Sequence, residues 1–210
     1  MGAGAVGGYF GGVLANQDED VIMIARGRHG TAILDNGLTV DSHWGNFTVQ
    51  TGVTDDPSTV GNVDLILHCT KLYSNREAVP ALREMVGDET TILTLQNGVT
   101  SGSIIAGYFG LDRVLQGAAY IESSIAGPGH IHQSGSTAMI EFGEADGAPS
   151  ERIELIRQLF DKPGIQVQIS SNIVDTLWSK LVSVGSIGTI MTASRANLPE
   201  ILRSPHGKET

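Results

Sequence analysis

Short, continuous apolar runs alternate with stretches of helical period along the first half of the chain. The apolar runs, each long enough for a buried parallel strand, cover residues 20–25, 63–70 and 92–95. Apolar residues recur every three or four positions in the segments between them, over residues 5–16, 26–37 and 75–86 and again through Ile104 and Ile105. Strands that alternate with helices imply right-handed crossovers, so the sequence predicts an α/β fold with a doubly wound parallel sheet.

The pattern departs from this alternation in two places. Residues 38–54 alternate like a hairpin around Gly45 and Asn46. From Val114 onward, short extended pieces predict two or three further strands, for which an antiparallel arrangement fits best. A helix from Ser150 to Phe160, with Ser150 as its N-cap, and a last strand over residues 165–170 follow.

Beyond Ser171 the period is helical and no further strand is expected. We therefore expect a dinucleotide-binding domain over residues 1–170 and the beginning of an all-helical domain for substrate binding or dimerisation over residues 171–210. Trp178, Leu181 and Val182 are expected to pack between helices of the second domain. A homodimer, if one forms, is expected to use this helical domain.

Composition narrows the classes of partner. The 210 residues include 13 Lys plus Arg against 23 Asp plus Glu, and the formal net charge of −10 argues against a general affinity for nucleic acid or for an anionic membrane. The sequence has neither an apolar run of membrane-spanning length nor a signal-peptide pattern, and its single cysteine, Cys69, suits a reducing cytoplasm. The scattered histidines lack the companion ligands of a metal site, so none is expected.

The chain opens with a G-x-G-x-x-G pattern formed by Gly2, Gly4 and Gly7. In dinucleotide-binding folds the first glycine permits a tight turn, the second lets the backbone approach a pyrophosphate, and the third lets the helix pack closely on the sheet. A chain with 27 glycines produces such spacings by chance, but here a helix and then a strand follow in the right order. This context favours a genuine phosphate-binding turn.

A turn of this kind normally follows a buried strand, and only Met1 precedes it here. That strand belongs between the strands of residues 20–25 and 63–70. We therefore expect these two strands to flank a gap of about 4.8 Å on each side of an empty strand position. We also expect this chain alone to bind NADPH weakly or not at all, and a version extended by a short apolar strand to bind it well.

Three residues at strand ends are candidates for ligand binding. Arg26 follows the strand expected over residues 20–25, a position where NAD-binding proteins usually carry a carboxylate. Arg28 and His29 lie close behind it. A guanidinium suits a 2'-phosphate, so the preferred cofactor is NADPH, although a solvated basic turn is the alternative. Lys71 and Asn97 end two successive strands at the carboxyl edge of the sheet, which favours a shared cleft.

Several motifs in the same order resemble the ketopantoate reductases, also called 2-dehydropantoate 2-reductases: "GAGAVGGYFGG", "IARGRHGTAILDNGLTV", the strand ending in Lys71, "LQNGV" and "WSKL". The resemblance implies NADPH-dependent reduction of a 2-keto acid, ketopantoate to pantoate, on the route to pantothenate and coenzyme A. It also implies roles for individual residues. The pyrophosphate would lie along Gly2, Gly4, Ala5, Val6 and Gly7, the adenosine 2'-phosphate near Arg26 and Lys71, and the nicotinamide ribose and substrate near Asn97, with Lys180 acting in catalysis.

The sequence departs from this family in two respects. Val184 and Gly188 stand where better-studied members carry two asparagines, which places ketopantoate itself in doubt. Family members also continue past residue 210 with further helices, so this chain is expected to be truncated at both ends. A dinucleotide-binding module without catalysis, or an inactive fragment of such a reductase, is the competing hypothesis.

Overall fold

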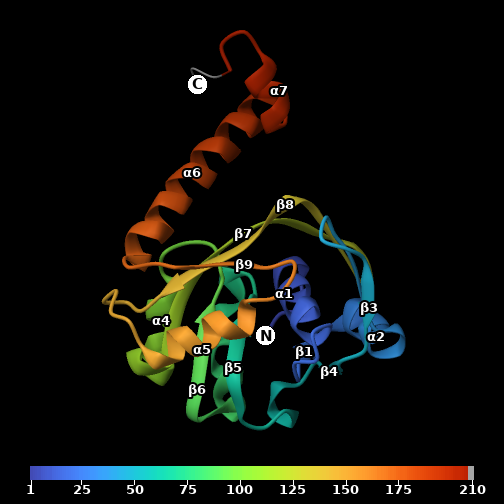
Figure 1. Cartoon of the computed structure of the whole chain (residues 1–210), viewed down its shortest axis with the longest axis vertical. Coiled ribbons are helices and arrows are strands. Elements are labelled where there is room, and N and C mark those ends of the chain that lie inside the picture. Colours follow the sequence, from blue (N-terminus) through green and yellow to red (C-terminus); the bar gives the residue numbers. More distant parts are fainter. Residues whose placement is uncertain (208–210) are drawn as a thin grey trace.

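A computed structural model describes residues 1–207 of the chain (Figure 1). Its centre is a seven-stranded mixed sheet in the order β3-β2-β8-β7-β6-β5, with β9 paired to β8. The strands of this sheet are β2 (Leu38–Asp41), β3 (Phe47–Val49), β5 (Val63–His68), β6 (Val86–Thr94), β7 (Val114–Gly127), β8 (His130–Gly143) and β9 (Gln166–Ile169). A separate two-stranded parallel sheet pairs β1 (Ile22–Ile24) with β4 (Gly52–Thr54).

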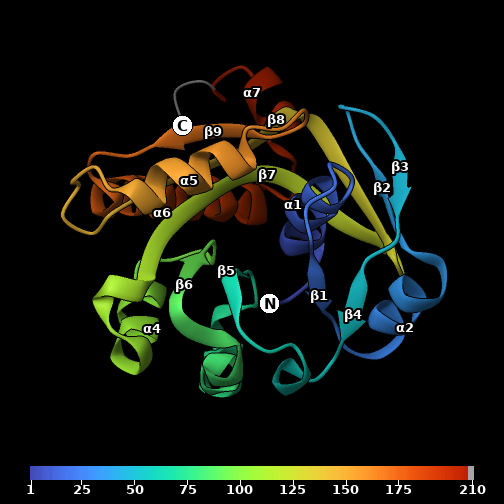
Figure 2. The same cartoon turned by 60° about the horizontal axis from the view of Figure 1, so that its bottom comes forward.

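Helices cover the strands, and short 3-10 turns connect several of them (Figure 2). The α-helices are α1 (Ala5–Ala15), α2 (Gly27–Asn36), α3 (Asn75–Ala78), α4 (Ser101–Phe109), α5 (Glu151–Phe160), α6 (Ile173–Ser194) and α7 (Leu198–Arg203). The 3-10 turns are η1 (Pro57–Thr59), η2 (Leu72–Ser74), η3 (Pro80–Met85) and η4 (Leu111–Arg113). None of these helices is both long and apolar enough to cross a membrane.

The Rossmann-type α/β class expected from the sequence is confirmed, and several local signals explain its elements. Helix α2 ends at Gly37, which adopts a φ of +80° that favours glycine. Helix α5 begins after Ser150, whose hydroxyl accepts a hydrogen bond from the Ile153 amide at 3.3 Å. β7 and β8 are antiparallel as expected, each is 14 residues long, and together they form one hairpin, whereas β9 pairs with β8 in parallel.

The helix expected over residues 75–86 is wrong in part. Only Asn75–Ala78 is α-helical, and the chain continues as the 3-10 turn η3 from Pro80. Proline has no N–H and its ring clashes with the preceding turn, so it ends the α-helical hydrogen bonding here. Val86, expected at the end of the helix, instead begins β6.

The N-terminus lies between β1 and β5, which do not pair with each other (Figure 2). The Met1 ammonium donates to the Leu67 carbonyl at 2.8 Å, and the amide of Gly2 donates to the Ile24 carbonyl at 3.2 Å. The first two residues therefore connect the two sheets at their carboxyl edges. The remainder of the expected strand position is an open groove of about 390 Å³.

Helix α6 leaves the α/β body and carries α7 at its far end (Figure 1). Its first turns are anchored by Ile173 and Leu177, which pack against Ala118 of β7. The prediction that Trp178, Leu181 and Val182 pack between helices is wrong for residues 1–207, because these side chains are 52%, 41% and 63% exposed. The proposed boundary between residues 170 and 171 stays a prediction.

Candidate functional site

The glycine turn before α1 has the geometry that close ligand approach requires. Gly2 has a φ of +87°, and a Cβ atom there would lie 3.0 Å from the Thr70 amide nitrogen. A Cβ atom at Gly7 would lie 2.4 Å from the Gly2 carbonyl oxygen, so this glycine allows α1 to begin directly against the turn. At Gly4 a Cβ atom would meet no atom within 4 Å, so the space beside this residue is open.

The amino end of α1 faces this space with unpaired backbone donors. Gly4 is the N-cap and offers no side-chain cap, and the helical hydrogen bonds begin with the Gly8 amide donating to the Gly4 carbonyl at 2.6 Å. The amides of Ala5, Val6 and Gly7 precede that bond and carry the positive end of the helix dipole. The open cradle at Gly4 and these three donors fit a pyrophosphate.

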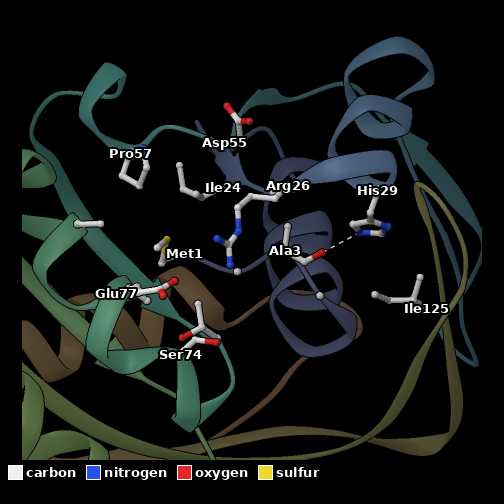
Figure 3. A pocket seen from close by; sticks show the side chains of 16 residues that line it. Met1, Ala3, Ile24, Arg26, His29, Asp55, Pro57, Ser74, Glu77 and Ile125 are labelled. Carbon is white, nitrogen blue, oxygen red and sulfur yellow. Dashed lines mark hydrogen bonds between the residues drawn. The ribbon is translucent and has the colours of Figure 1, made fainter.

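A pocket of about 340 Å³ extends from the glycine turn to the carboxyl end of β1 (Figure 3). Arg26, the N-cap residue of α2, is exposed, and its side chain turns into this pocket between Met1 and Ala3. Asp55 and Glu77 line the same pocket. The charges available to an adenosine ribose are thus one guanidinium and two carboxylates.

His29, which the sequence placed close behind Arg26 as a further basic residue, connects two turns through hydrogen bonds of its ring. Its Nδ1 accepts a hydrogen bond from the Gly129 amide at 3.0 Å, so Nε2 carries the proton and donates to the Ala3 carbonyl at 2.8 Å. The ring therefore joins the glycine turn, at Ala3 (Figure 3), to the turn of the β7–β8 hairpin, at Gly129. Residues 29 and 129 are too far apart in sequence for spacing to have indicated this contact.

Lys71 follows β5 and is exposed, and it does not line the pocket at Arg26. Its neighbours Thr70 and Ser74 line that pocket instead. Thr70 was missed from the sequence, although its place at the end of a buried apolar run, directly before Lys71, was a usable signal. A role for Lys71 at a 2'-phosphate stays a prediction.

A buried polar network joins the ends of β5 and β6. The Gln96 side-chain amide donates to the Thr70 carbonyl at 2.8 Å and to Asn75 Oδ1 at 2.7 Å. His68 Nε2 lies 3.2 Å from the same Asn75 oxygen, while His68 Nδ1 has no hydrogen-bond partner within residues 1–207. Burial lowers the pKa of His68 from its usual 6.5 to about 4, so the ring is neutral at physiological pH.

Lys180, expected to act in catalysis, and Asn97, expected near the nicotinamide ribose and substrate, lie in direct contact. The Lys180 ammonium donates to Asn97 Oδ1 at 3.0 Å and to the Ala119 carbonyl at 2.6 Å, and it lies 5.2 Å from the centre of the Tyr120 ring. Burial lowers the pKa of Lys180 from its usual 10.5. Neither Ala119 nor Tyr120 was predicted from the sequence. Ala119 contributes only its backbone carbonyl, which every residue type has, so its identity could not indicate this contact.

The two halves of the site are linked through the strand ends. Thr70 packs against Gly2 and is hydrogen-bonded to Gln96, and Asn97 next to it holds Lys180. Beside Lys180 lies a cavity of about 40 Å³, which Val184 also lines. Gly188, one helical turn further along α6, faces open space. The two departures from the family pattern therefore lie on the same helix as Lys180.

Cys69 contributes no nucleophile to this site. Burial raises the pKa of its thiol to about 12, so the thiolate is scarce at neutral pH. Within residues 1–207 no group of three or more His, Cys, Asp or Glu side chains is placed to hold a metal ion.

Comparison with known proteins shows the family to which this chain belongs. The family described as ketopantoate reductase PanE/ApbA matches residues 1–147. The chain belongs to this family. It is thereby placed among oxidoreductases that work with a nicotinamide dinucleotide, and its fold and motif order are those expected of a ketopantoate reductase.

Individual relatives extend the match to nearly the whole chain. An uncharacterized oxidoreductase of Bacillus subtilis, YkpB, is 29% identical over 100% of this chain and 69% of its own length. The 2-dehydropantoate 2-reductase of Pyrococcus horikoshii is 31% identical over 91% of this chain and 62% of its own length. The chain thus spans about two thirds of the length of these two relatives.

Solved structures agree with the fold. The 2-dehydropantoate 2-reductase of Geobacter metallireducens GS-15 superposes with a TM-score of 0.91 at 31% identity, covering 100% of this chain and 69% of that one. A D-mandelate dehydrogenase solved with NADH and anilino(oxo)acetate superposes with a TM-score of 0.84 at 22% identity, covering 99% and 67%. The second likeness shows the fold alone.

Proposed function

We propose that this ketopantoate reductase family member reduces a 2-keto acid with NADPH, and that 2-dehydropantoate (ketopantoate) is its substrate, giving pantoate for pantothenate and coenzyme A. The single observation that supports this best is the Lys180 ammonium held between Asn97 and Ala119 at the carboxyl edge of the sheet. The matching family and the named reductases among the relatives support the same reaction.

The glycine turn and α1 would hold the cofactor. Gly2, Gly4 and Gly7 leave room for the pyrophosphate, and the amides of Ala5 and Val6 would bond to it. Arg26 would bind the adenosine 2'-phosphate from inside its pocket, and Lys71 is proposed to contribute from outside it. When bound, the reduced nicotinamide supplies a hydride to the carbonyl carbon of the keto acid.

Lys180 would supply the proton. An ammonium has three N–H donors, and Asn97 and Ala119 accept two of them, which leaves one to point at the carbonyl oxygen of a substrate. As that oxygen gains negative charge, the ammonium stabilises it and transfers a proton from Nζ, which leaves a neutral amine. The pKa lowered by burial makes this transfer easier than it is for an exposed lysine.

A dinucleotide-binding module without turnover is the second candidate. The cavity beside Lys180 measures about 40 Å³, and the side chains of α6 beyond it are exposed. A six-carbon keto acid therefore has little enclosure in residues 1–207, which favours binding of the dinucleotide alone.

Fluorescence titration with NADPH and NADH, alongside rate assays with ketopantoate and a panel of other 2-keto acids, separates the two candidates. Turnover that is lost in Lys180→Ala and kept in Lys162→Ala supports the reductase. Lys180→Arg keeps the charge but does not release a proton, so it tests proton transfer separately from charge. Binding of NADPH without turnover of any keto acid favours the module.

A further inference from the structure

The Lys180 ammonium contacts an aromatic ring in addition to its two oxygen partners. Its Nζ lies 5.2 Å from the centre of the Tyr120 ring, and both side chains are partly buried. The face of an aromatic ring carries partial negative charge, so it attracts a cation at this distance, and the attraction grows as water is excluded. Two consecutive residues of β7 therefore hold the ammonium, Ala119 through its carbonyl and Tyr120 through its ring.

The pairing of β7 with β8 brings a carboxylate to the same face of the sheet. Side chains at positions 118 and 120 of β7 point to one face, and Ala118 lies opposite Glu141 in the antiparallel pair. The Glu141 side chain therefore lies diagonally across from Tyr120, within reach of a long aromatic side chain. Both residues line one open pocket on this face.

Glu141 acts on the hydroxyl end of the Tyr120 side chain. Burial raises the pKa of the Tyr120 phenol, and the negative charge and hydrogen-bond acceptance of the Glu141 carboxylate raise it further. The phenol therefore keeps its proton at neutral pH. A phenol that donates to a carboxylate is polarised toward the ring, which makes the ring face more attractive to an ammonium.

Glu141 also anchors the turn of α6 that precedes Lys180. The Thr176 hydroxyl donates to Glu141 Oε1 at 3.0 Å and lies 2.9 Å from the Ser170 hydroxyl. Thr176 and Lys180 are four residues apart, so they lie on the same face of the helix. One carboxylate thus supports both the ring beside the ammonium and the helix that carries it.

Other charged groups on the elements packed against α6 are placed less directly. Glu122 follows Tyr120 on the same face of β7 and is exposed. Asp175 lies on α6 itself, five residues before Lys180 and therefore on a different side of the helix. Helix α7 packs at the far end of α6, away from the ammonium (Figure 1). Tyr120 and the carboxylate behind it are thus the nearest charge-stabilising side chains.

We propose that Tyr120 and Glu141 are positioning residues for Lys180. The Tyr120 ring holds the ammonium in place and favours its charged form, while the Glu141 carboxylate orients the ring and anchors α6. This inference rests on the proposed reductase function, in which Lys180 transfers the proton. It differs from a packing role, because an aliphatic side chain of similar reach could pack against α6 but could not attract a cation.

The direct test is the titration of the Lys180 ammonium in the full chain. The sequence has four lysines, so labelling lysine Cε with ¹³C gives few NMR signals, and Lys180→Ala identifies the one from Lys180. Tyr120→Leu keeps an apolar side chain beside the ammonium but removes the ring face, so we expect the midpoint to move about one pH unit lower. Tyr120→Phe keeps the ring and is expected to stay within a few tenths of a pH unit of the unmodified chain.

A charge variant of Glu141 provides the second arm. Glu141→Gln keeps an oxygen for the Thr176 hydroxyl but removes the negative charge, so the Lys180 midpoint should move about half a pH unit lower. Glu151→Gln makes the same change at the exposed start of α5 and should leave the midpoint unchanged. This arm decides the matter if Tyr120→Leu fails to fold by circular dichroism.

Three titration results would overturn the proposal. They are an unchanged or raised midpoint in folded Tyr120→Leu, an equal fall in Tyr120→Phe, and an unchanged midpoint in Glu141→Gln. Each would show that the ring or the carboxylate only packs against α6.

Rate measurements separate this proposal from the proposed function. In Tyr120→Leu, kcat for 2-keto acid reduction should fall about 5- to 30-fold with KM for NADPH within twofold, and its decline at high pH should begin about one pH unit earlier. Tyr120→Phe should restore most of kcat. If the unmodified chain reduces no keto acid, the proposed function fails, while the titration still decides whether Tyr120 holds the ammonium. Turnover that is equal in the unmodified chain and Tyr120→Leu would overturn the positioning role alone.

Discussion

The two cations that the sequence singled out, Lys180 and Arg26, are held in opposite ways. Lys180 is partly buried, and two oxygen atoms fix its ammonium before any ligand arrives. Arg26 is exposed at the rim of its pocket, and its guanidinium makes no hydrogen bond or ion pair with the described residues. The ammonium of Lys180 is therefore already positioned in the absence of a ligand. The side chain of Arg26, in contrast, would become fixed only when a cofactor binds.

The largest expected effect is at the fixed cation. Lys180→Ala is expected to lower kcat for 2-keto acid reduction by about 10²- to 10⁴-fold, the range for loss of a positioned proton donor. Because burial lowers the pKa of Lys180, kcat should also fall as the pH rises, with a midpoint below pH 10.5, since the ammonium is then lost. A pH profile of kcat checks this. A variant with near-normal kcat would end the catalytic assignment.

The buried polar network that joins the ends of β5 and β6 provides the next test. His68 stays neutral in the folded chain down to about pH 4, while in the unfolded chain it takes up a proton below about pH 6.5. The unfolded state therefore binds more protons in this window, and stability falls as the pH falls. The expected loss from this residue is about 2 kcal/mol between pH 7 and pH 5.

Urea unfolding followed by circular dichroism at both pH values measures this loss. His68→Gln lacks the titrating ring, so its stability should depend less on pH over the same window. An unchanged pH dependence in the variant would show that other groups cause it.

Substitution of Arg26 should have a smaller effect than substitution of Lys180, and it should change only the affinity for the cofactor. Arg26→Ala is expected to weaken NADPH about 10- to 100-fold through loss of charge-assisted hydrogen bonds, with little change for NADH. Arg28→Ala is the matched control, because Arg28 is exposed on the same helix and does not line the pocket. Equal losses for NADPH and NADH would remove the argument for a 2'-phosphate at Arg26.

The sequence predicted the elements whose signals are local. Gly37 ends α2 and Ser150 caps α5 because each acts within a few residues of its own position. The broken helix at Pro80 was within reach of the same reasoning, since proline removes a donor wherever it falls. The full length of β7 and β8 was not, because small residues and glycines interrupt their apolar pattern while pairing across the hairpin keeps them extended.

The candidate site was predictable as residues but not as contacts. Spacing and resemblance selected Asn97 and Lys180, yet their pairing depends on how α6 crosses β7, which leaves no local signal. The tie that His29 makes to Gly129 spans 100 residues and uses a backbone amide. Such contacts follow from tertiary packing, so the sequence presented His29 as one more basic residue.

Helix α1 has a consequence for the order of folding. Gly7, Gly8, Gly11 and Gly12 each disfavour helix by about 1 kcal/mol relative to alanine. Close packing offsets this loss, since Cβ atoms at Gly8 and Gly12 would lie 3.0 Å from Ile131 and 2.9 Å from Leu38. We therefore expect α1 to become helical only after β2 and β8 have assembled. The turn that would hold a pyrophosphate is then among the last parts of the molecule to acquire its structure.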